Sequence, residues 1–307
     1  MFEDVSISTK DFILPIFVCE GNKIKREIKS LDGHYEYSID ELIKYCDIIK
    51  KNGISSIILF GVTENKNDNC STAIDGNAII PKAIREIKKN NKDIIIIADL
   101  CNCEYTVNGQ CGIVVDGDVD NDKTNEILAK QAIILAQSGA DAIAPSDMMD
   151  GRVKVIRRKL DLNGFQKTLI FPYSVKYASA FYSPFRKAAN INVSNIDRRT
   201  YQMNYKNSES FINEVKLDID EGADAIIIKP ALIYLDIIWR AKQLYKLPII
   251  SYNVSGEFLL MKSNIKNEFF DYENCLYESM IALKRAGSNA IISYHALEMA
   301  RIIKNHD

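Results

Sequence analysis

Three cysteines lie close together in one stretch of this 307-residue chain, at Cys101, Cys103 and Cys111. Their spacing, C-x-C-x7-C, gives three thiolates that can bind one zinc ion and leave its fourth tetrahedral position open to water or substrate, as in catalytic zinc sites. Structural zinc sites usually contain CxxC pairs, and none of the chain's three histidines is near this stretch. The spacing therefore favours a zinc site, with three free thiols at the end of a buried strand as the alternative.

Two lysines each end a run of apolar residues, Lys176 in PYSVK and Lys229 in IIIKP. Burial at the end of a strand disfavours the charged ammonium, and two neighbouring amines lower each other's pKa. A neutral lysine amine is the nucleophile that forms a Schiff base with a carbonyl substrate. The alternative for each lysine is a snorkelling or salt-bridged surface residue. Asp99 and Asp147 follow two other apolar runs, and each is either an acid–base group or a cap of the next segment.

Arginines and hydroxyls supply candidate anion-binding groups. Arg186, Arg198 and Arg199 lie in one long connection, and their forked donors suit a carboxylate or a phosphate. Ordinary surface ion pairs are the alternative for each of them. Ser255 and Tyr294 end two further apolar runs, where their hydroxyls could bind an anion at the same end of the fold.

Eight short apolar runs alternate with helix-period segments, and this pattern predicts an α/β fold, a closed parallel (β/α)8 TIM barrel. The runs are nearly continuous in apolar residues, as expected of strands buried on both faces. An open doubly wound sheet is the alternative, but no GxGxxG motif supports it. The expected strands cover residues 14–20, 54–62, 93–100, 141–147, 168–175, 224–231, 248–255 and 289–296.

Two connections of the expected barrel are unusually long, residues 99–124 and residues 176–208. Both follow the C-terminal ends of strands, where barrel active sites lie, so we expect them to form active-site lid loops. Residues 1–13 are expected to form a short N-terminal arm, and residues 14–307 a single catalytic barrel domain.

Composition limits the partners and the compartment. The formal net charge of −2 gives no reason to expect binding to nucleic acid or to an anionic membrane. The N-terminus shows no basic segment followed by an apolar core, and the apolar runs are too short to span a bilayer. Seven cysteines, an odd number, suggest reduced thiols, so we expect a cytoplasmic protein.

Several long phrases resemble the porphobilinogen synthase family, also called the 5-aminolevulinate dehydratase family. They run in family order along nearly the whole chain: LPIFVCEG, DLCNCEYTVNGQCG, APSDMMDGRV, YSVKYASAFYSPFRKAA, DRRTYQMN, EGADAIIIKPALIYLDI and SYNVSGEF. The resemblance implies condensation of two 5-aminolevulinate molecules to porphobilinogen with loss of two waters, a step toward haem and other tetrapyrroles. A class I aldolase, or a lapsed relative that only binds metal or ligand, is the alternative.

The resemblance also implies roles for the two lysines and the lid. Lys229 matches the Schiff-base lysine of the substrate that contributes the propionyl side, and Lys176 that of the acetyl side. The residues matching the family's carboxylate-binding positions are Arg186, Arg198 and Gln202 for the acetyl side, and Ser255 and Tyr294 for the propionyl side.

By the same resemblance, the three cysteines bind a catalytic zinc ion near the acetyl-side amine, and Asp99 and Ser146 lie near that amine. Glu214 matches an allosteric magnesium ligand of some members, and a solvated acid is the alternative. Many members have histidines where this chain has Asn108 and Gln110, and Asn253 replaces another common histidine.

The family assembles as homo-oligomers. In its octamers a long N-terminal arm wraps a neighbouring subunit, whereas only 13 residues precede Leu14 here. We therefore expect a homo-oligomer, an octamer by family resemblance, with a dimer or a hexamer as the alternative.

Overall fold

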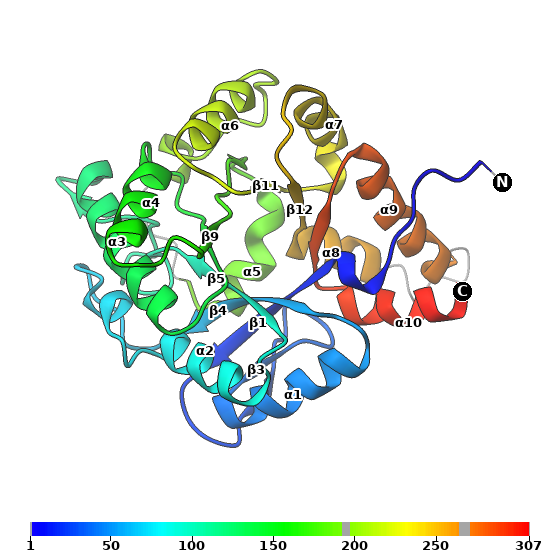
Figure 1. Ribbon diagram of the computed structural model, residues 1–307, viewed down its shortest axis with the longest axis horizontal. Helices are drawn as coiled ribbons and strands as arrows, with labels where there is room; N and C mark the ends of the chain where they lie inside the picture. The colour runs from blue at the N-terminus through cyan, green and yellow to red at the C-terminus, as the bar shows by residue number, and fades with distance from the viewer. Residues whose placement is uncertain (1, 192–196, 264–270, 307) are drawn as a thin grey trace.

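The computed structural model describes residues 2–191, 197–263 and 271–306, and its centre is a ring of parallel strands. Figure 1 shows the ring with the larger helices arranged around its outside. The strands follow one another around the ring in sequence order, as in a (β/α)8 barrel. They are β1 (Phe12–Cys19), β4 (Ser56–Val62), β5 (Ile95–Leu100), β8 (Ala142–Pro145), β9 (Leu169–Ile170), β10 (Val175–Lys176), β11 (Ile226–Lys229), β12 (Ile249–Asn253) and β13 (Ala290–Ser293).

The ring closes through the fifth expected strand, which the structure divides into β9 and β10. β9 pairs with β8, and β10 pairs with β11. Between them, the Tyr173 amide donates to the Pro145 carbonyl at 2.9 Å, and the Ile227 amide donates to the Pro172 carbonyl at 2.8 Å. Pro172 has no amide hydrogen to donate, which is a local reason for the break. The predicted eight-stranded barrel is therefore confirmed, with one interrupted strand.

Helices cover the outside of the ring because each carries an apolar face. In α1, Leu42, Cys46 and Ile49 are buried at spacings of four and three residues, and Asp40 and Glu41 favour the positive end of the helix dipole. The outer helices are α1 (Ile39–Lys51), α2 (Ile79–Asn90), α3 (Asn121–Gln137), α4 (Arg152–Leu162), α6 (Ser210–Asp220), α7 (Leu235–Leu244), α9 (Tyr272–Ala286) and α10 (Ala296–His306).

Side chains alternate along the strands between two core layers. In β1, Leu14 and Ile16 belong to the layer between strands and helices, whereas Ile13 and Phe17 point into the barrel. Both layers are buried, which explains why the strands read as continuous apolar runs.

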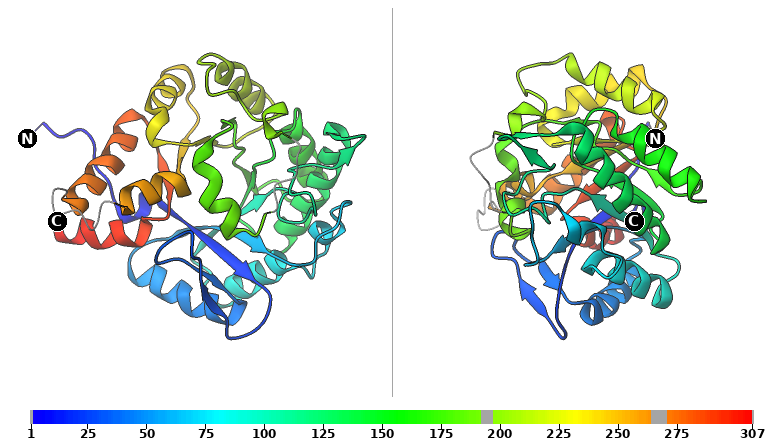
Figure 2. Two further views of the ribbon diagram at one scale, coloured as in Figure 1. Left: turned by 180° about the vertical axis from the view of Figure 1, so that it is seen from behind. Right: turned by 90° about the vertical axis from the view of Figure 1, so that its left-hand side faces the viewer.

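The 3-10 helix Thr9–Asp11 directly precedes β1, and the other smaller elements lie in the connections that follow the strands of the barrel. Figure 2 (left) shows α5 lying across the ring, on the side facing away from the viewer in Figure 1. The smaller elements are β2 (Lys25–Glu27), β3 (Tyr35–Tyr37), β6 (Val114–Val115), β7 (Asp118–Val119), α5 (Ser183–Ala188), α8 (Ser255–Lys262) and the 3-10 helices η1 (Thr9–Asp11), η2 (Ser71–Ile74), η3 (Ala180–Tyr182), η4 (Arg198–Thr200) and η5 (Leu232–Tyr234). β1 begins at Phe12, two residues before the run expected from the sequence. No helix among the described residues is both long enough and apolar enough to cross a membrane.

Candidate active site

The two strand-end lysines lie side by side at the C-terminal end of the barrel. Lys176 ends β10 and Lys229 ends β11, and the parallel pairing of these strands places the two residues opposite each other in register. Both side chains are buried, with 6% and 5% of their surfaces exposed. The sheet thus brings two amines together in a site largely closed to solvent.

Aromatic rings surround the Lys229 amine. Its Nζ lies 4.2 Å from the ring centroid of Tyr252 and 5.0 to 5.2 Å from those of Phe185, Tyr182 and Tyr173. Burial and, after it, the charge of Lys176 lower the pKa of Lys229 to about 7. Close to half of the Lys229 amine is therefore neutral at neutral pH. Nothing in the residue types or spacing distinguishes these rings from ordinary core residues.

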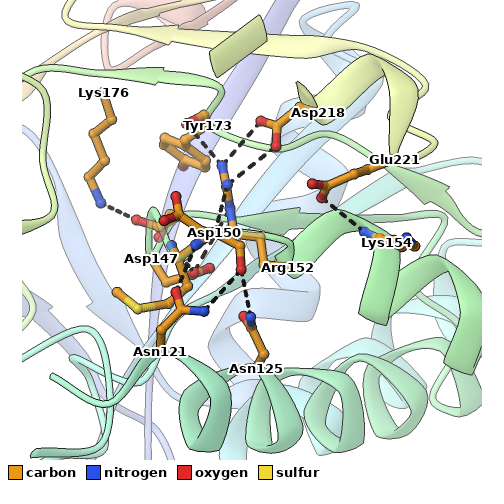
Figure 3. Close-up of polar contacts among 12 residues, drawn as sticks. Asn121, Asn125, Asp147, Asp150, Arg152, Lys154, Tyr173, Lys176, Asp218 and Glu221 are labelled. Atoms are coloured by element: carbon orange, nitrogen blue, oxygen red, sulfur yellow. Dashed lines mark hydrogen bonds and ion pairs between the residues drawn. The ribbon is translucent and has the colours of Figure 1, made fainter. Parts of the chain in front are cut away.

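Lys176 points toward the turn after β8. Its Nζ donates to the carbonyl oxygen of Ser146, and Figure 3 shows the side chain extended to this turn. The Ser146 hydroxyl donates to Asp99 Oδ2 at 3.1 Å. Burial raises the pKa of Asp99 to about 6, although both lysines lower it. Asp99 can therefore hold or release a proton near neutral pH, beside both amines.

The three predicted metal ligands converge. The sulfur atoms of Cys101, Cys103 and Cys111 lie within 4.8 Å of one another, and all three residues are buried. Hydrogen bonds from the other two thiols hold the pKa of Cys111 well below its usual range, and hydrogen bonds with Cys103 and Cys111, together with burial, raise that of Cys101. A cluster that already favours one thiolate, made of soft sulfur donors only, suits zinc.

One cavity joins these groups to two arginines of the lid. Arg186 lies in α5 and Arg198 in η4. Among the described residues, the Nε atoms of both arginines have no hydrogen-bond partner. Arg199, by contrast, pairs with Asp197 at the surface and has 75% of its side chain exposed. The cavity is lined by Phe60, Asp99, Cys103, Ser146, Lys176, Tyr182, Phe185, Arg186, Arg198 and Lys229.

The sequence model of one family, delta-aminolevulinic acid dehydratase, matches residues 1–302. The chain belongs to this family. Two similar proteins bear the family name: that of Helicobacter pylori is 45% identical over 307 residues, covering 100% of this chain and 95% of that protein, and that of Archaeoglobus fulgidus is 45% identical over 300 residues, covering 98% and 93%.

A solved structure agrees with both the family and the fold. It is the delta-aminolevulinic acid dehydratase (porphobilinogen synthase) of Toxoplasma gondii ME49 in complex with the reaction product porphobilinogen. It superposes on this chain with a TM-score of 0.95 at 35% identity, covering 98% of this chain and 86% of the other. The chain is therefore an enzyme of the delta-aminolevulinic acid dehydratase family with the TIM-barrel fold.

Three further residues matched to this family are not among those that line the lysine cavity, and their contacts are as follows. Ser255 accepts a hydrogen bond from the Phe185 amide at 3.0 Å and donates to the Phe181 carbonyl at 3.2 Å, so it connects α8 to the lid. The Tyr294 hydroxyl lies 3.3 Å from that of Tyr252, one of the rings around Lys229. Gln202 is buried, and neither polar atom of its side chain has a hydrogen-bond partner within the described residues.

The contacts of Asp147 are those of a residue that stabilises the fold. It is fully buried, and its Oδ2 accepts a hydrogen bond from the Met149 amide at 2.8 Å, as a capping carboxylate does. Figure 3 shows Arg152 between Asp147 and Asp218, and its Nη2 lies 3.2 Å from Asp218 Oδ2. The capping alternative therefore describes Asp147 better than the acid–base one. The sequence did not single out Arg152, because an arginine in the first turn of an amphipathic helix usually faces solvent.

Glu214 lies in α6, away from the cysteine cluster, and lines a second pocket together with Gln202 and Asp150. Burial raises the pKa of Glu214, and the nearby Asp150 raises it further, although Arg152 lowers it. Within the described residues, the only three or more acidic, histidine or cysteine ligands close enough to hold one ion are the three cysteines. Glu214 alone therefore provides no complete ligand set in this chain.

Proposed function

We propose that the enzyme condenses two molecules of 5-aminolevulinate into porphobilinogen and two waters, through Schiff bases on Lys176 and Lys229. The observation that carries this proposal is the in-register pair of buried lysines beside three converging cysteines. Membership of the dehydratase family and the product-bound Toxoplasma gondii relative support it.

In the first step a neutral amine attacks the substrate ketone. A carbon–nitrogen bond forms, the carbonyl oxygen leaves as water, and the lysine retains the substrate as an imine. The pKa of about 7 supplies neutral amine at Lys229 without a separate base. Holding both ketones on adjacent strands converts a reaction between two molecules into one within the site.

The two substrates are identical, so the site must orient them through different carboxylate contacts. We assign the propionyl side to Lys229, with Ser255 and Tyr294 binding its carboxylate. The acetyl side belongs to Lys176, with Arg186, Arg198 and Gln202 binding its carboxylate. The Nε atoms of the two arginines and the side-chain amide of Gln202 have no partner among the described residues, which leaves donors for this second carboxylate.

We assign proton transfer to Asp99. Its carboxyl is hydrogen-bonded to Ser146, whose carbonyl accepts from Lys176, and its pKa of about 6 lets it accept a proton from the acetyl-side amine and release it later. Cys101, Cys103 and Cys111 would hold zinc, which would supply a Lewis acid for that amine or for water.

Further assignments follow from the family and are proposed with the activity. Glu214 is proposed to bind an allosteric magnesium ion, completed by ligands other than those described above. We also propose a homo-oligomer and a cytoplasmic location, where the seven cysteines stay reduced. A class I aldolase needs one Schiff-base lysine and no cysteine cluster, so the paired lysines and the thiol cluster argue against that alternative.

Trapping the imine tests the proposal. Borohydride added with 5-aminolevulinate should reduce the imine and leave a stable adduct on Lys229, which peptide mass spectrometry locates. Lys229→Ala should lose both the adduct and turnover, whereas Lys216→Ala should keep both, because Lys216 is exposed and pairs with Asp220 at the surface. An unmodified Lys229 in active enzyme would contradict the covalent mechanism.

A further inference from the structure

The cysteine loop and the arginine lid meet at the side chain of Gln110. Gln110 stands one residue before the proposed zinc ligand Cys111. In the structure its Oε1 accepts a hydrogen bond from the Tyr201 hydroxyl at 2.6 Å. Tyr201 belongs to the lid and follows η4 directly.

The same hydroxyl also contacts the backbone of the cysteine loop. The Cys111 amide donates to Tyr201 Oη at 3.4 Å, so the hydroxyl accepts from Cys111 and donates to the residue before it, Gln110. Hydrogen bonds within the loop also hold the backbone of Gln110. The Gln110 backbone amide donates to Asn108 Oδ1 at 2.8 Å, and the Gln110 carbonyl accepts from the Thr106 hydroxyl at 2.9 Å.

Residues 198–203 connect this contact to the proposed substrate-binding residues Arg198 and Gln202 and to Lys176. Arg198 donates through Nη2 to the carbonyl of Gly109, in the cysteine loop. Gln202 follows Tyr201 directly, and its amide donates to the Arg198 carbonyl at 2.8 Å. The Met203 amide then donates to the carbonyl of Lys176 at 3.0 Å. One short segment therefore connects the cysteine loop to a proposed Schiff-base lysine.

We propose that Gln110 and Tyr201 form a latch through which the cysteine loop positions Arg198 and Gln202 for the substrate carboxylate. The inference rests on the proposed function for its substrate, 5-aminolevulinate. Both latch residues are positioning residues, since we propose that they act through Arg198 and Gln202 and not on the substrate itself. A metal ion that orders the cysteine loop then also orders the lid, and by linkage a closed lid strengthens metal binding by the same factor.

The first test is a KM-against-kcat comparison. Tyr201→Phe keeps the ring and removes the hydroxyl, and we expect the KM for 5-aminolevulinate to rise about threefold to tenfold, the equivalent of one hydrogen bond, with kcat within about twofold. Gln110→Met should raise KM at least as much. Tyr205→Phe is the matched control, because Tyr205 is a lid tyrosine with 58% of its surface exposed, and its KM should not change.

A double-mutant cycle separates a latch from two independent effects. If the two residues act as a pair, the double variant with Tyr201→Phe and Gln110→Met should have a KM less than about twofold above that of Gln110→Met alone. If the increase in KM of the double variant equals the product of the two single-variant increases, the proposal is overturned.

The second test does not need the reaction, so it distinguishes failure of the latch from failure of the proposed function. Zinc added to metal-free enzyme should slow tryptic cleavage after Arg199, whose side chain is 75% exposed. In Tyr201→Phe this protection should fall, and the zinc dissociation constant measured by chelator competition should rise about threefold to tenfold. Unchanged protection and zinc affinity in Tyr201→Phe would overturn the latch, even in an enzyme that makes porphobilinogen.

Discussion

At the scale of single residues, Lys229 combines burial, aromatic neighbours and a second amine. Burial and the charge of Lys176 lower the pKa of Lys229 to about 7. A neutral amine is the reactive form, so the rate of imine formation rises with pH as Lys229 loses its proton and levels off above its pKa. Asp99, whose attraction works in the opposite direction, keeps the pKa of Lys229 from falling further.

The rate at which borohydride traps the substrate imine on Lys229 should depend on pH. In the wild-type enzyme, the initial rate of borohydride-trapped adduct formation should rise through a midpoint near pH 7. Lys176→Met removes the neighbouring charge that lowers the pKa, so its midpoint should move to higher pH. Quantitative mass spectrometry of the Lys229 peptide measures both curves. Identical midpoints would show that the two amines do not interact.

The lid arginines provide a second prediction at this scale, because two adjacent arginines have different surroundings. Arg198 is buried and lines the lysine cavity, whereas Arg199 is exposed and pairs with Asp197. Arg198→Gln should raise the KM for 5-aminolevulinate about 10-fold to 100-fold, since a hydrogen bond to a charged group contributes about 1.5–3 kcal/mol. Arg199→Gln should leave KM within about twofold. Steady-state kinetics measures the KM of both variants. Equal increases in KM would contradict the assignment of Arg198 to the carboxylate site.

At the scale of elements, the lid depends on close packing between α8 and η3. A Cβ atom on Gly256, in α8, would lie 2.7 Å from both the Cα and the carbonyl oxygen of Phe181. Neither backbone atom can move without displacing the lid. The neighbouring Ser255 bonds to the same carbonyl, so the contact also fixes a proposed carboxylate-binding residue.

Gly256→Ala should therefore displace the lid and lower kcat/KM about 10-fold to 100-fold, as small misplacements of binding groups do. Gly76→Ala is the control, because a Cβ there meets nothing within 4 Å. Kinetics with 5-aminolevulinate measures both variants. A wild-type kcat/KM in Gly256→Ala would show that a Cβ atom fits at this contact without displacing the lid.

The sequence predicted the barrel well because its strands are buried on both faces and read as apolar runs. It did not predict the break in the fifth strand, although Pro172 is a local reason for it. The β2 and β3 hairpin also escaped prediction: all three residues of β2 are exposed, so no apolar alternation marks them.

The candidate site was predictable where residue types are unusual and unpredictable where they are common. Paired strand-end lysines and three clustered cysteines are rare enough to stand out. The tyrosines around Lys229 resemble any buried aromatic residue, and only the closed ring brings Tyr173 and Tyr252 together. Arg152 lies in a family phrase, but its burial between two aspartates depends on α6 packing beside α4.

At the scale of the whole molecule, the ion pair between Arg152 and Asp218 joins the start of α4 to α6. Both residues are buried, and Arg152 also donates to the carbonyl of Met149 at 3.0 Å. Removing one partner of a buried ion pair leaves the other charge without compensation. The contact therefore holds together the part of the barrel wall that carries Ser146 and Lys176.

Asp218→Asn should lower the free energy of unfolding by about 3 kcal/mol, the low end for breaking a buried pair, because Asp147 still partly compensates Arg152. Asp220→Asn, in the same helix, is the control: Asp220 pairs with Lys216 at the surface, and its loss should cost less than about 1 kcal/mol. Urea unfolding compares the two variants. Equal losses would show that the buried pair contributes no more than a surface one.

The most direct test of the account is formation of porphobilinogen from 5-aminolevulinate, followed colorimetrically with a metal chelator and then with zinc added back. We expect product in the untreated enzyme, loss of activity with chelator, and recovery with zinc in the wild type but not in Cys103→Ser, which lacks one of the three converging thiols. Absence of porphobilinogen from zinc-loaded enzyme would contradict the proposed reaction. Full activity in the presence of chelator would contradict the role assigned to the cysteines.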